Sequence, residues 1–317
     1  MPVIFGKAPG KIILFGEHAV VYDQPAIAIP VSRVNATARI TPNISAAPGL
    51  VRLIAPDIQL DTPLDRLPED HPLASVVRAT LSEVSPHHTP SFSIQVNSTI
   101  PISAGLGSGA AVTVAILRAL SAFLGHPLPD EKISEMAFEI EKLYHGTPSG
   151  IDNTVIAYQE PVYFKKGTPL EVLKIEKPTW WIIADSGEKT PTKTTVAAVR
   201  QACEEDPEAY REIFNRIGSV ADAARPALIS GDLTALGKLM NENQALLQSL
   251  HVSSEKLDRL CQAALNAGAV GAKLSGGGRG GNMIALTSPQ DCDRVSQALA
   301  AAGATQTIIT TLREAAE

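Results

Sequence analysis

The sequence contains little cysteine. Its three cysteines, Cys203, Cys261 and Cys292, are odd in number and widely spaced. A disulfide framework or a zinc site requires paired or clustered cysteines, so the sequence predicts neither. The expected location is the reducing cytoplasm.

A long, uninterrupted hydrophobic run is also missing. Lys7 breaks the opening MPVIFGK, which does not provide the apolar core of a signal peptide. Residues 89–117 carry no formal charge, but Pro90, Asn97 and Pro101 interrupt them, and a membrane helix tolerates such breaks poorly. The sequence predicts neither export nor a membrane partner.

Positive charge is not in excess, because the formal net charge is −6. A nucleic-acid-binding surface needs clustered Lys and Arg to displace counterions from phosphates. We therefore expect no nucleic-acid partner, while a local basic pocket for a single phosphate stays compatible with the composition.

The chain of 317 residues is long enough for two domains, since single cores rarely grow beyond about 250 to 300 residues. Its 44% hydrophobic and 19% charged residues are typical of a globular protein with a sizeable core. After Tyr163 the chain turns polar at residues 165–168. We predict domains at residues 1–168 and 169–317.

A strand, a glycine loop and a helix follow one another near residue 100. Residues 91–100 alternate as a strand, residues 101–111 are rich in glycine, and residues 110–124 form an apolar, Ala-rich helix. Asp130 is expected as the N-cap of a second helix that ends before Gly146. Residues 11–22 predict a strand, a tight turn at Gly16 and a second strand.

Residues 101–111, PISAGLGSGAA, suggest a backbone that wraps around phosphates. Gly105, Gly107 and Ala110 match the GxGxxA spacing of dinucleotide-binding loops, but no Asp or Glu occurs in residues 119–129 to bind a ribose. The GxxxxGK[ST] phosphate loop is absent too. Glycine permits close approach of backbone N–H groups, and a following helix N-terminus favours anions. A tight turn that only packs a helix on a sheet is the alternative.

Residues 145–153, HGTPSGIDN, place the carboxylate of Asp152 just after a turn of small residues, as expected of a catalytic base facing a substrate. Glu139 and Glu141 fall near the C-terminal end of the preceding helix. Carboxylates there oppose the helix dipole, so one of them is expected to have a partner such as a metal ion. A solvated glutamate is the alternative.

Four segments together carry a family resemblance: APGKIILFGEHAVVY (residues 8–22), PISAGLGSGAA, HGTPSGIDN, and GAKLSGGGRGGNMIAL (residues 271–286). They resemble the GHMP kinase superfamily and, within it, the mevalonate kinases. The resemblance implies an α+β fold with an N-terminal ribosomal-protein-S5-like domain, a C-terminal ferredoxin-like α/β sandwich domain and an active site in the cleft between them. It also implies transfer of the γ-phosphoryl group of ATP to the 5-hydroxyl of mevalonate, with Mg²⁺, in a protein that is often a homodimer.

The resemblance assigns roles by motif position. Asp152 is the expected base, Lys11 the catalytic lysine that stabilises the developing alkoxide, and Ser108 and Glu141 the Mg²⁺ ligands. The residues expected around the ATP phosphates are Pro101, Ser103, Ala104, Gly105, Leu106, Gly107, Ser108, Gly109, Ala110 and Ala111. Those expected near the acceptor are Glu17, His18, His145, Thr192, Lys193, Gly277 and Gly278.

Alternatives stay open at several of these positions. His18 and His145 could be structural histidines, and Arg279, which departs from the family pattern inside the last glycine loop, could reach a phosphate or face solvent. Another alcohol or sugar as acceptor, or a catalytically silent protein that senses ATP and a metabolite, is the rival function. Intact Lys11, Ser108, Glu141 and Asp152 favour an active kinase.

Overall fold

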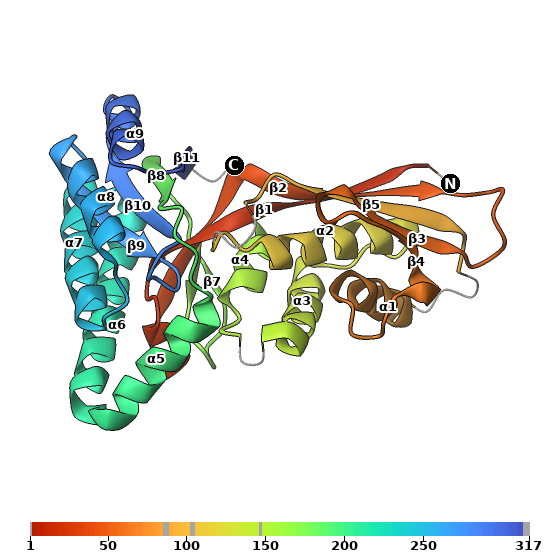
Figure 1. The fold of residues 1–317 in the computed structure, drawn as a ribbon, viewed down its shortest axis with the longest axis horizontal. Helices are drawn as coiled ribbons and strands as arrows, with labels where there is room; N and C mark the ends of the chain where they lie inside the picture. Colours follow the sequence, from red (N-terminus) through yellow and green to blue (C-terminus); the bar gives the residue numbers. More distant parts are fainter. Residues whose placement is uncertain (1, 85–88, 102–104, 146–147, 313–317) are drawn as a thin grey trace. The chain divides into compact units, whose positions relative to one another are not determined.

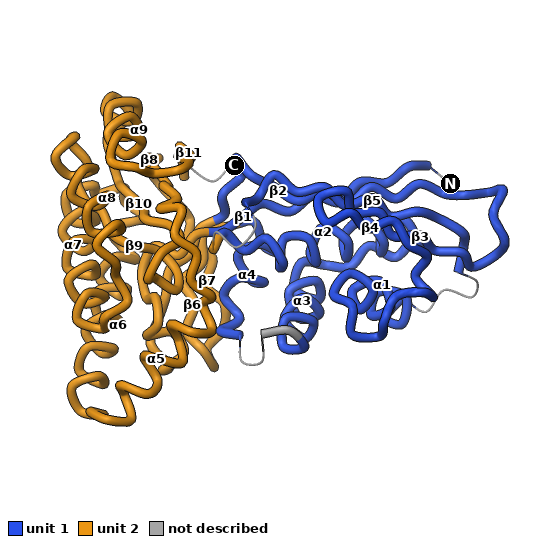
Figure 2. Tube along the Cα trace, viewed as in Figure 1, with its two compact units in different colours: residues 1–11, 30–102, 106–159 blue, residues 12–29, 103–105, 160–317 orange. Residues whose placement is uncertain are grey.

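The computed structural model describes residues 2–84, 89–101, 105–145 and 148–312, without the side chains of residues 144 and 145. The chain forms two compact units that share its N-terminal strands (Figure 2). Unit 1 contains residues 1–11, 30–102 and 106–159, and unit 2 contains residues 12–29, 103–105 and 160–317. Both units are assembled from separate stretches of the chain. The domain boundary predicted at residue 168 stays a prediction.

The sheet of unit 1 contains strands of both orientations. Strand β3 (Val51–Ala55) lies between β4 (Leu60–Pro63) and β5 (Phe92–Ser98), and β5 pairs with β2 (Ala26–Pro42). The β3–β5 pair is parallel, whereas the β3–β4 and β2–β5 pairs are antiparallel. Strand β1 (Ile4–Phe15) pairs with β2. Its burial pattern shows that the residues from Pro9 onward are buried, so β1 carries Lys11 into the interior.

Four helices of unit 1 pack against one another beside this sheet (Figure 1). They are α1 (Pro72–Val84), α2 (Ser108–Phe123), α3 (Asp130–His145) and α4 (Ile151–Tyr158). Helix α2 has buried residues on nearly every side because its sequence is rich in Ala, Val, Ile and Leu, and it contacts α1, α3, α4 and β5. It is the helix predicted after the glycine loop, and α3 begins at Asp130, within one residue of the predicted start.

Unit 2 contains a four-stranded antiparallel sheet in the order β11-β8-β10-β9, with strands Gln306–Leu312, Thr179–Asp185, Asn282–Thr287 and Gly271–Ser275. The remaining short strands are β6 (Val162–Phe164), which pairs with residues 26–28 of β2, and β7 (Glu171–Val172). The helices of unit 2 are α5 (Thr192–Glu205), α6 (Pro207–Ser230), α7 (Leu233–Ser249), α8 (Glu255–Asn266) and α9 (Cys292–Ala301). Helices α7, α8 and α9 contact the four-stranded sheet, α6 packs on α7, and α5 packs on α6 (Figure 1).

The second strand predicted within residues 11–22 is wrong. Strand β1 ends at Phe15, and Ala19–Tyr22 forms a short 3₁₀ helix instead. Gly16 and His18 both adopt positive φ angles, 94° and 62°, which reverse the chain and prevent an extended continuation. Along the ranges that the structure describes, no helix is both long enough and apolar enough to cross a membrane.

Candidate active site

Lys11 and Asp152 form an ion pair inside unit 1. The Nζ atom of Lys11 lies 2.8 Å from Oδ1 of Asp152, and the two side chains are 6% and 26% exposed. Lys11 comes from β1, and its backbone N–H donates to the carbonyl of Leu106 in the glycine segment at 3.0 Å. Asp152 lies in the first turn of α4, where the helix dipole favours a negative charge. A shielded lysine is therefore paired with a carboxylate that solvent can still reach.

Glu141 of α3 shares the electrostatic environment of this pair. Its side chain is half-buried, and its Oε2 atom is shielded from solvent without a hydrogen-bond partner among the described residues. Burial raises the pKa of Glu141 to about 7; the negative charge of Asp152 adds to this rise, and the positive charge of Lys11 opposes it. A bound cation would stabilise the ionised carboxylate of Glu141 and so lower its pKa. The orphaned carboxylate oxygen is what a metal-ligand role predicts.

The glycine segment leads directly into α2. Gly105 and Gly107 adopt positive φ angles of 71° and 72°, and α2 begins at Ser108 without a side-chain cap on its first N–H groups. A Cβ atom on Gly107 would lie 2.9 Å from Cγ of Lys11 and 2.9 Å from Cδ1 of Ile156. Glycine is required here because any side chain would displace Lys11. The uncapped N–H groups are suited to bind an anion such as a phosphate.

The residues present fit a magnesium ion bound together with a nucleotide. Within the described ranges, no cluster of three or more His, Cys, Asp and Glu side chains could hold a metal unaided. Mg²⁺ commonly uses one or two protein oxygens and completes its shell with phosphate oxygens and water. Ser108 and Glu141 offer a hydroxyl and a carboxylate, which are the hard oxygen donors that this ion prefers.

A second polar cluster lies in unit 2. Glu17 and Lys273 form an ion pair through Oε1 and Nζ, and both side chains are 0% exposed. Burial lowers the pKa of Lys273, and the charge of Glu17 opposes this shift. The neighbouring His18 is buried, and its Nε2 atom lies 2.9 Å from the carbonyl oxygen of Gly277. Burial lowers the pKa of His18, the bond to Gly277 opposes the shift, and the charge of Arg279 adds to it.

The last glycine loop, residues 276–281, packs against the turn between α7 and α8. A Cβ atom on Gly278 would lie only 2.0 Å from the carbonyl oxygen of Val252, so no larger residue fits. Arg279 donates its backbone N–H to the same carbonyl at 2.6 Å and its Nε–H to the carbonyl of His251 at 3.1 Å. Arg279 therefore holds the loop on this turn.

Comparisons with known proteins agree along the whole chain. Residues 73–160 match the family model described as GHMP kinases N terminal domain, and residues 224–305 match GHMP kinases C terminal. Mevalonate kinase from Pyrococcus abyssi is 38% identical over 96% of this chain and 95% of its own length. The chain belongs to the mevalonate kinase family of GHMP kinases. The resemblance predicted from the sequence is confirmed.

Solved structures of mevalonate kinases share the fold. The Methanococcus jannaschii mevalonate kinase superposes with a TM-score of 0.84 at 27% identity, covering 99% of both chains. The L. major mevalonate kinase in complex with R-mevalonate gives a TM-score of 0.83 at 27% identity, covering 100% of this chain and 97% of that one. The predicted two-domain α+β kinase fold is confirmed.

The structure places the residues predicted from sequence in two groups, each of which is described within its own unit. Unit 1 brings together Lys11, Glu141 and Asp152 with Gly107. Leu106 and Ala111 are buried, Pro101, Ser108 and Ala110 are half-buried, and Gly109 is exposed. Ser103 and Ala104 lie outside the described residues, as does the side chain of His145, the last residue of α3.

Unit 2 brings His18 and Thr192 to Gly277. A Cβ atom on Gly277 would lie 3.1 Å from Oγ1 of Thr192, at the start of α5. Lys193 is exposed on the same turn. Glu17 meets Lys273, a residue that sequence reasoning missed. A lysine between Ala272 and Leu274 in an apolar strand was the available signal, because a charge in a buried strand requires a partner.

Proposed function

We propose that this chain transfers the γ-phosphoryl group of ATP to the 5-hydroxyl of (R)-mevalonate and releases 5-phosphomevalonate and ADP. The proposal combines membership of the mevalonate kinase family with one observation, the ion pair between Lys11 and Asp152 beside the glycine segment. A hydroxyl group is a poor nucleophile until its proton leaves, so a kinase for an alcohol needs a base and a nearby positive charge.

In the proposed mechanism, Asp152 accepts the proton of the 5-hydroxyl as its oxygen attacks the γ-phosphorus atom. Asp152 is suited to this role because its carboxylate is partly open while its partner Lys11 is almost fully shielded. The ammonium group of Lys11 stabilises negative charge that develops on the attacking oxygen. General acid–base assistance of this kind contributes about 10² to 10⁴-fold in rate.

Phosphoryl transfer otherwise depends on alignment and on neutralisation of charge. We assign the phosphates of ATP to residues 105–111, where positive-φ glycines and the uncapped start of α2 present backbone N–H groups. Ser108 and Glu141 would hold Mg²⁺, which, when bound, neutralises phosphate charge. A homodimer and a cytoplasmic location stay predictions, and so do the acceptor contacts of Glu17, His18, His145, Thr192, Lys193, Gly277 and Gly278.

The decisive experiment is ³¹P NMR of the purified protein with ATP and Mg²⁺ in separate tubes that contain mevalonate, phosphomevalonate, galactose or homoserine. A new phosphomonoester coupled to a CH₂ group in the mevalonate tube alone is the expected result. A product in another tube would show that the acceptor is not mevalonate, and the proposed roles of Lys11 and Asp152 would still stand. Silence in every tube, with ATP bound, would contradict the kinase assignment and favour a sensor.

A further inference from the structure

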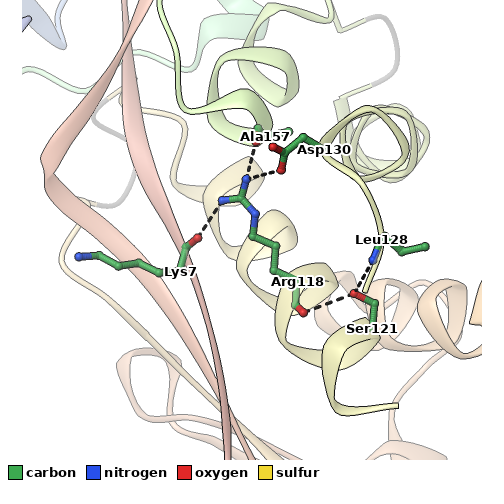
Figure 3. Close-up of polar contacts among 6 residues, drawn as sticks. All are labelled: Lys7, Arg118, Ser121, Leu128, Asp130 and Ala157. Carbon is green, nitrogen blue, oxygen red and sulfur yellow. Dashed lines mark hydrogen bonds and ion pairs between the residues drawn. The ribbon is translucent and has the colours of Figure 1, made fainter. Parts of the chain in front are cut away.

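Arg118 projects from the middle of α2 and contacts three other elements of unit 1 (Figure 3). Its Nη1 atom donates to the carbonyl of Lys7 in β1 at 3.0 Å. Its Nη2 atom lies 2.7 Å from Oδ1 of Asp130, the first residue of α3, and also donates to the carbonyl of Ala157 in the last turn of α4. One guanidinium therefore joins β1, α2, α3 and α4.

The guanidinium has further bonds available beside Ala157. When the amide oxygen of Gln159 faces Arg118, it accepts from Nη2 at 3.2 Å and from Nη1 at 2.9 Å. The side chain of Arg118 is only 16% exposed. Its position also suits both helix dipoles, because the cation lies at the C-terminus of α4 and its partner carboxylate lies at the N-terminus of α3. Lysine could not reproduce this planar, branched set of donors.

Each of the four joined elements carries one residue of the proposed site. Lys11 is on β1, Ser108 begins α2, Glu141 is on α3, and Asp152 is on α4. None of these four residues contacts the guanidinium in the hydrogen bonds that Arg118 makes. Arg118 can therefore affect them only through the elements that carry them.

We propose that Arg118 is a positioning residue for phosphoryl transfer, which fixes β1, α3 and α4 on α2 so that Lys11, Glu141 and Asp152 hold their reactive arrangement. This inference rests on the function proposed above. It concerns a residue in the body of unit 1 that no sequence motif of the family resemblance includes, since Arg118 follows the glycine segment within an apolar helix.

Helix geometry gives the size of the effect. With a rise of about 1.5 Å per residue, Arg118 lies roughly 15 Å along α2 from Ser108, and Asp130 lies roughly 16 Å along α3 from Glu141. A helix that pivots by about 4° at one end moves its other end by roughly 1 Å over such a length. A misplacement of about 1 Å at a reacting group can reduce the rate by about 10²-fold.

Arg78 offers a matched control in the same unit. It projects from α1, and its guanidinium donates to the backbone carbonyls of Leu64, Leu67, Pro68 and Glu69. Like Arg118, it joins a helix to neighbouring segments through carbonyl oxygens, and it is half-buried. Unlike Arg118, it contacts no element that carries Lys11, Ser108, Glu141 or Asp152 in these bonds. Its removal tests the cost of losing such an arginine without moving the site.

The test compares Arg118→Met, Arg118→Lys and Arg78→Met in the full-length chain, assayed with ATP and mevalonate well below the lowest melting temperature. We expect Arg118→Met to lower kcat by about 10 to 100-fold while both KM values change less than about 3-fold. The kcat of Arg118→Lys should lie between those of Arg118→Met and the wild type, because lysine keeps the positive charge at the end of α4. Arg78→Met and Arg118→Met should both lower Tm by a few degrees, but Arg78→Met should keep kcat within about 2-fold of the wild type.

Two results would overturn the positioning role: an Arg118→Met enzyme with kcat within about 2-fold of wild type, or equal losses of kcat in the Arg118 and Arg78 variants. If the wild type fails to phosphorylate mevalonate, the proposed function fails separately. Amide hydrogen exchange then tests whether Arg118 links β1 and α4 to α2. Faster exchange in α4 and residues 4–11 of Arg118→Lys, but not of Arg78→Met, supports the linkage, and unchanged exchange contradicts it.

Discussion

Removal of either partner from the Glu17–Lys273 ion pair should destabilise the protein strongly. Both side chains are 0% exposed, and Nζ of Lys273 also donates to the carbonyl of Leu274 at 2.7 Å. When one partner of such a pair is removed, the other charge must stay buried or be neutralised, which costs about 3–5 kcal/mol. We predict losses of this size in the free energy of unfolding for Glu17→Gln and for Lys273→Met at pH 7.

Neutralisation of the remaining group limits the part of each loss that comes from keeping a single charge buried. A free lysine titrates near pH 10.4, so its deprotonation at pH 7 costs about 4.6 kcal/mol, at about 1.36 kcal/mol per pH unit. The same cost falls to about 1.9 kcal/mol at pH 9. A free glutamate titrates near pH 4.3, so its protonation costs about 3.7 kcal/mol at pH 7 and about 1 kcal/mol at pH 5.

The two variants should therefore respond to pH in opposite directions. In Glu17→Gln, burial holds the pKa of Lys273 below its unfolded value, so the folded state binds fewer protons and stability rises from pH 7 to pH 9. In Lys273→Met, the buried carboxyl group takes up a proton, so stability rises from pH 7 to pH 5. The double variant Glu17→Gln/Lys273→Met should lose less free energy of unfolding than either single variant, because neither charged group remains to be buried.

Urea unfolding followed by tryptophan fluorescence measures the free energy of unfolding of each variant. Both tryptophans of the chain, Trp180 and Trp181, lie on β8, so the signal reports on unit 2, which contains the ion pair. Titrations at pH 5, 7 and 9 on the wild type and three variants complete the comparison. Single-variant losses below about 1 kcal/mol at pH 7, or a Glu17→Gln loss that does not shrink at pH 9, would refute the reasoning.

Four further outcomes are expected. Asp152→Asn should lower kcat at least about 10²-fold while ATP affinity is nearly kept, as measured by steady-state kinetics and nucleotide titration. Glu141→Gln should raise the Mg²⁺ concentration for half-maximal rate about 10-fold or more without lowering Tm, because the shielded Oε2 atom has no hydrogen-bond partner among the described residues. Gly107→Ala should lose about 1–3 kcal/mol in urea unfolding along with activity, whereas Gly109→Ala, where an added Cβ meets nothing within 4 Å, should keep its stability within about 0.5 kcal/mol. Because burial lowers the pKa of His18, its contribution to stability should be complete above about pH 6.5 and decline as the pH falls below it, and His18→Gln should flatten this slope in unfolding curves between pH 7 and pH 5.

Local patterns predicted most of the elements that carry the site. The apolar, Ala-rich run after the glycines became α2, and Asp130 begins α3, because burial and helix-start signals are properties of short segments. Helix α7 was not predicted, although its buried Leu236, Met240 and Leu247 recur at helical spacing. The strand expected after Gly16 failed because φ at His18 is set by packing of the buried turn and not by strand propensity.

Contacts between distant residues could not be predicted in this way. No periodicity links Lys11 to Asp152, and only the family resemblance suggested that both serve one reaction. Lys273 and Arg118 were overlooked for the same reason, since a charged residue inside an apolar segment shows that a partner exists without showing which one. These pairings depend on topology, which brings strand β9 to Glu17 and helices α3 and α4 to Arg118.

The interleaving of the two units bears on how the protein is made. All residues of unit 1 have been synthesised once the ribosome passes residue 159, so unit 1 can fold while the chain is still growing. Unit 2 includes residues 12–29, yet its sheet is complete only with β11 near the end of the chain. The carboxylate of Glu17 can therefore form this ion pair only after all the residues between it and Lys273 have been synthesised.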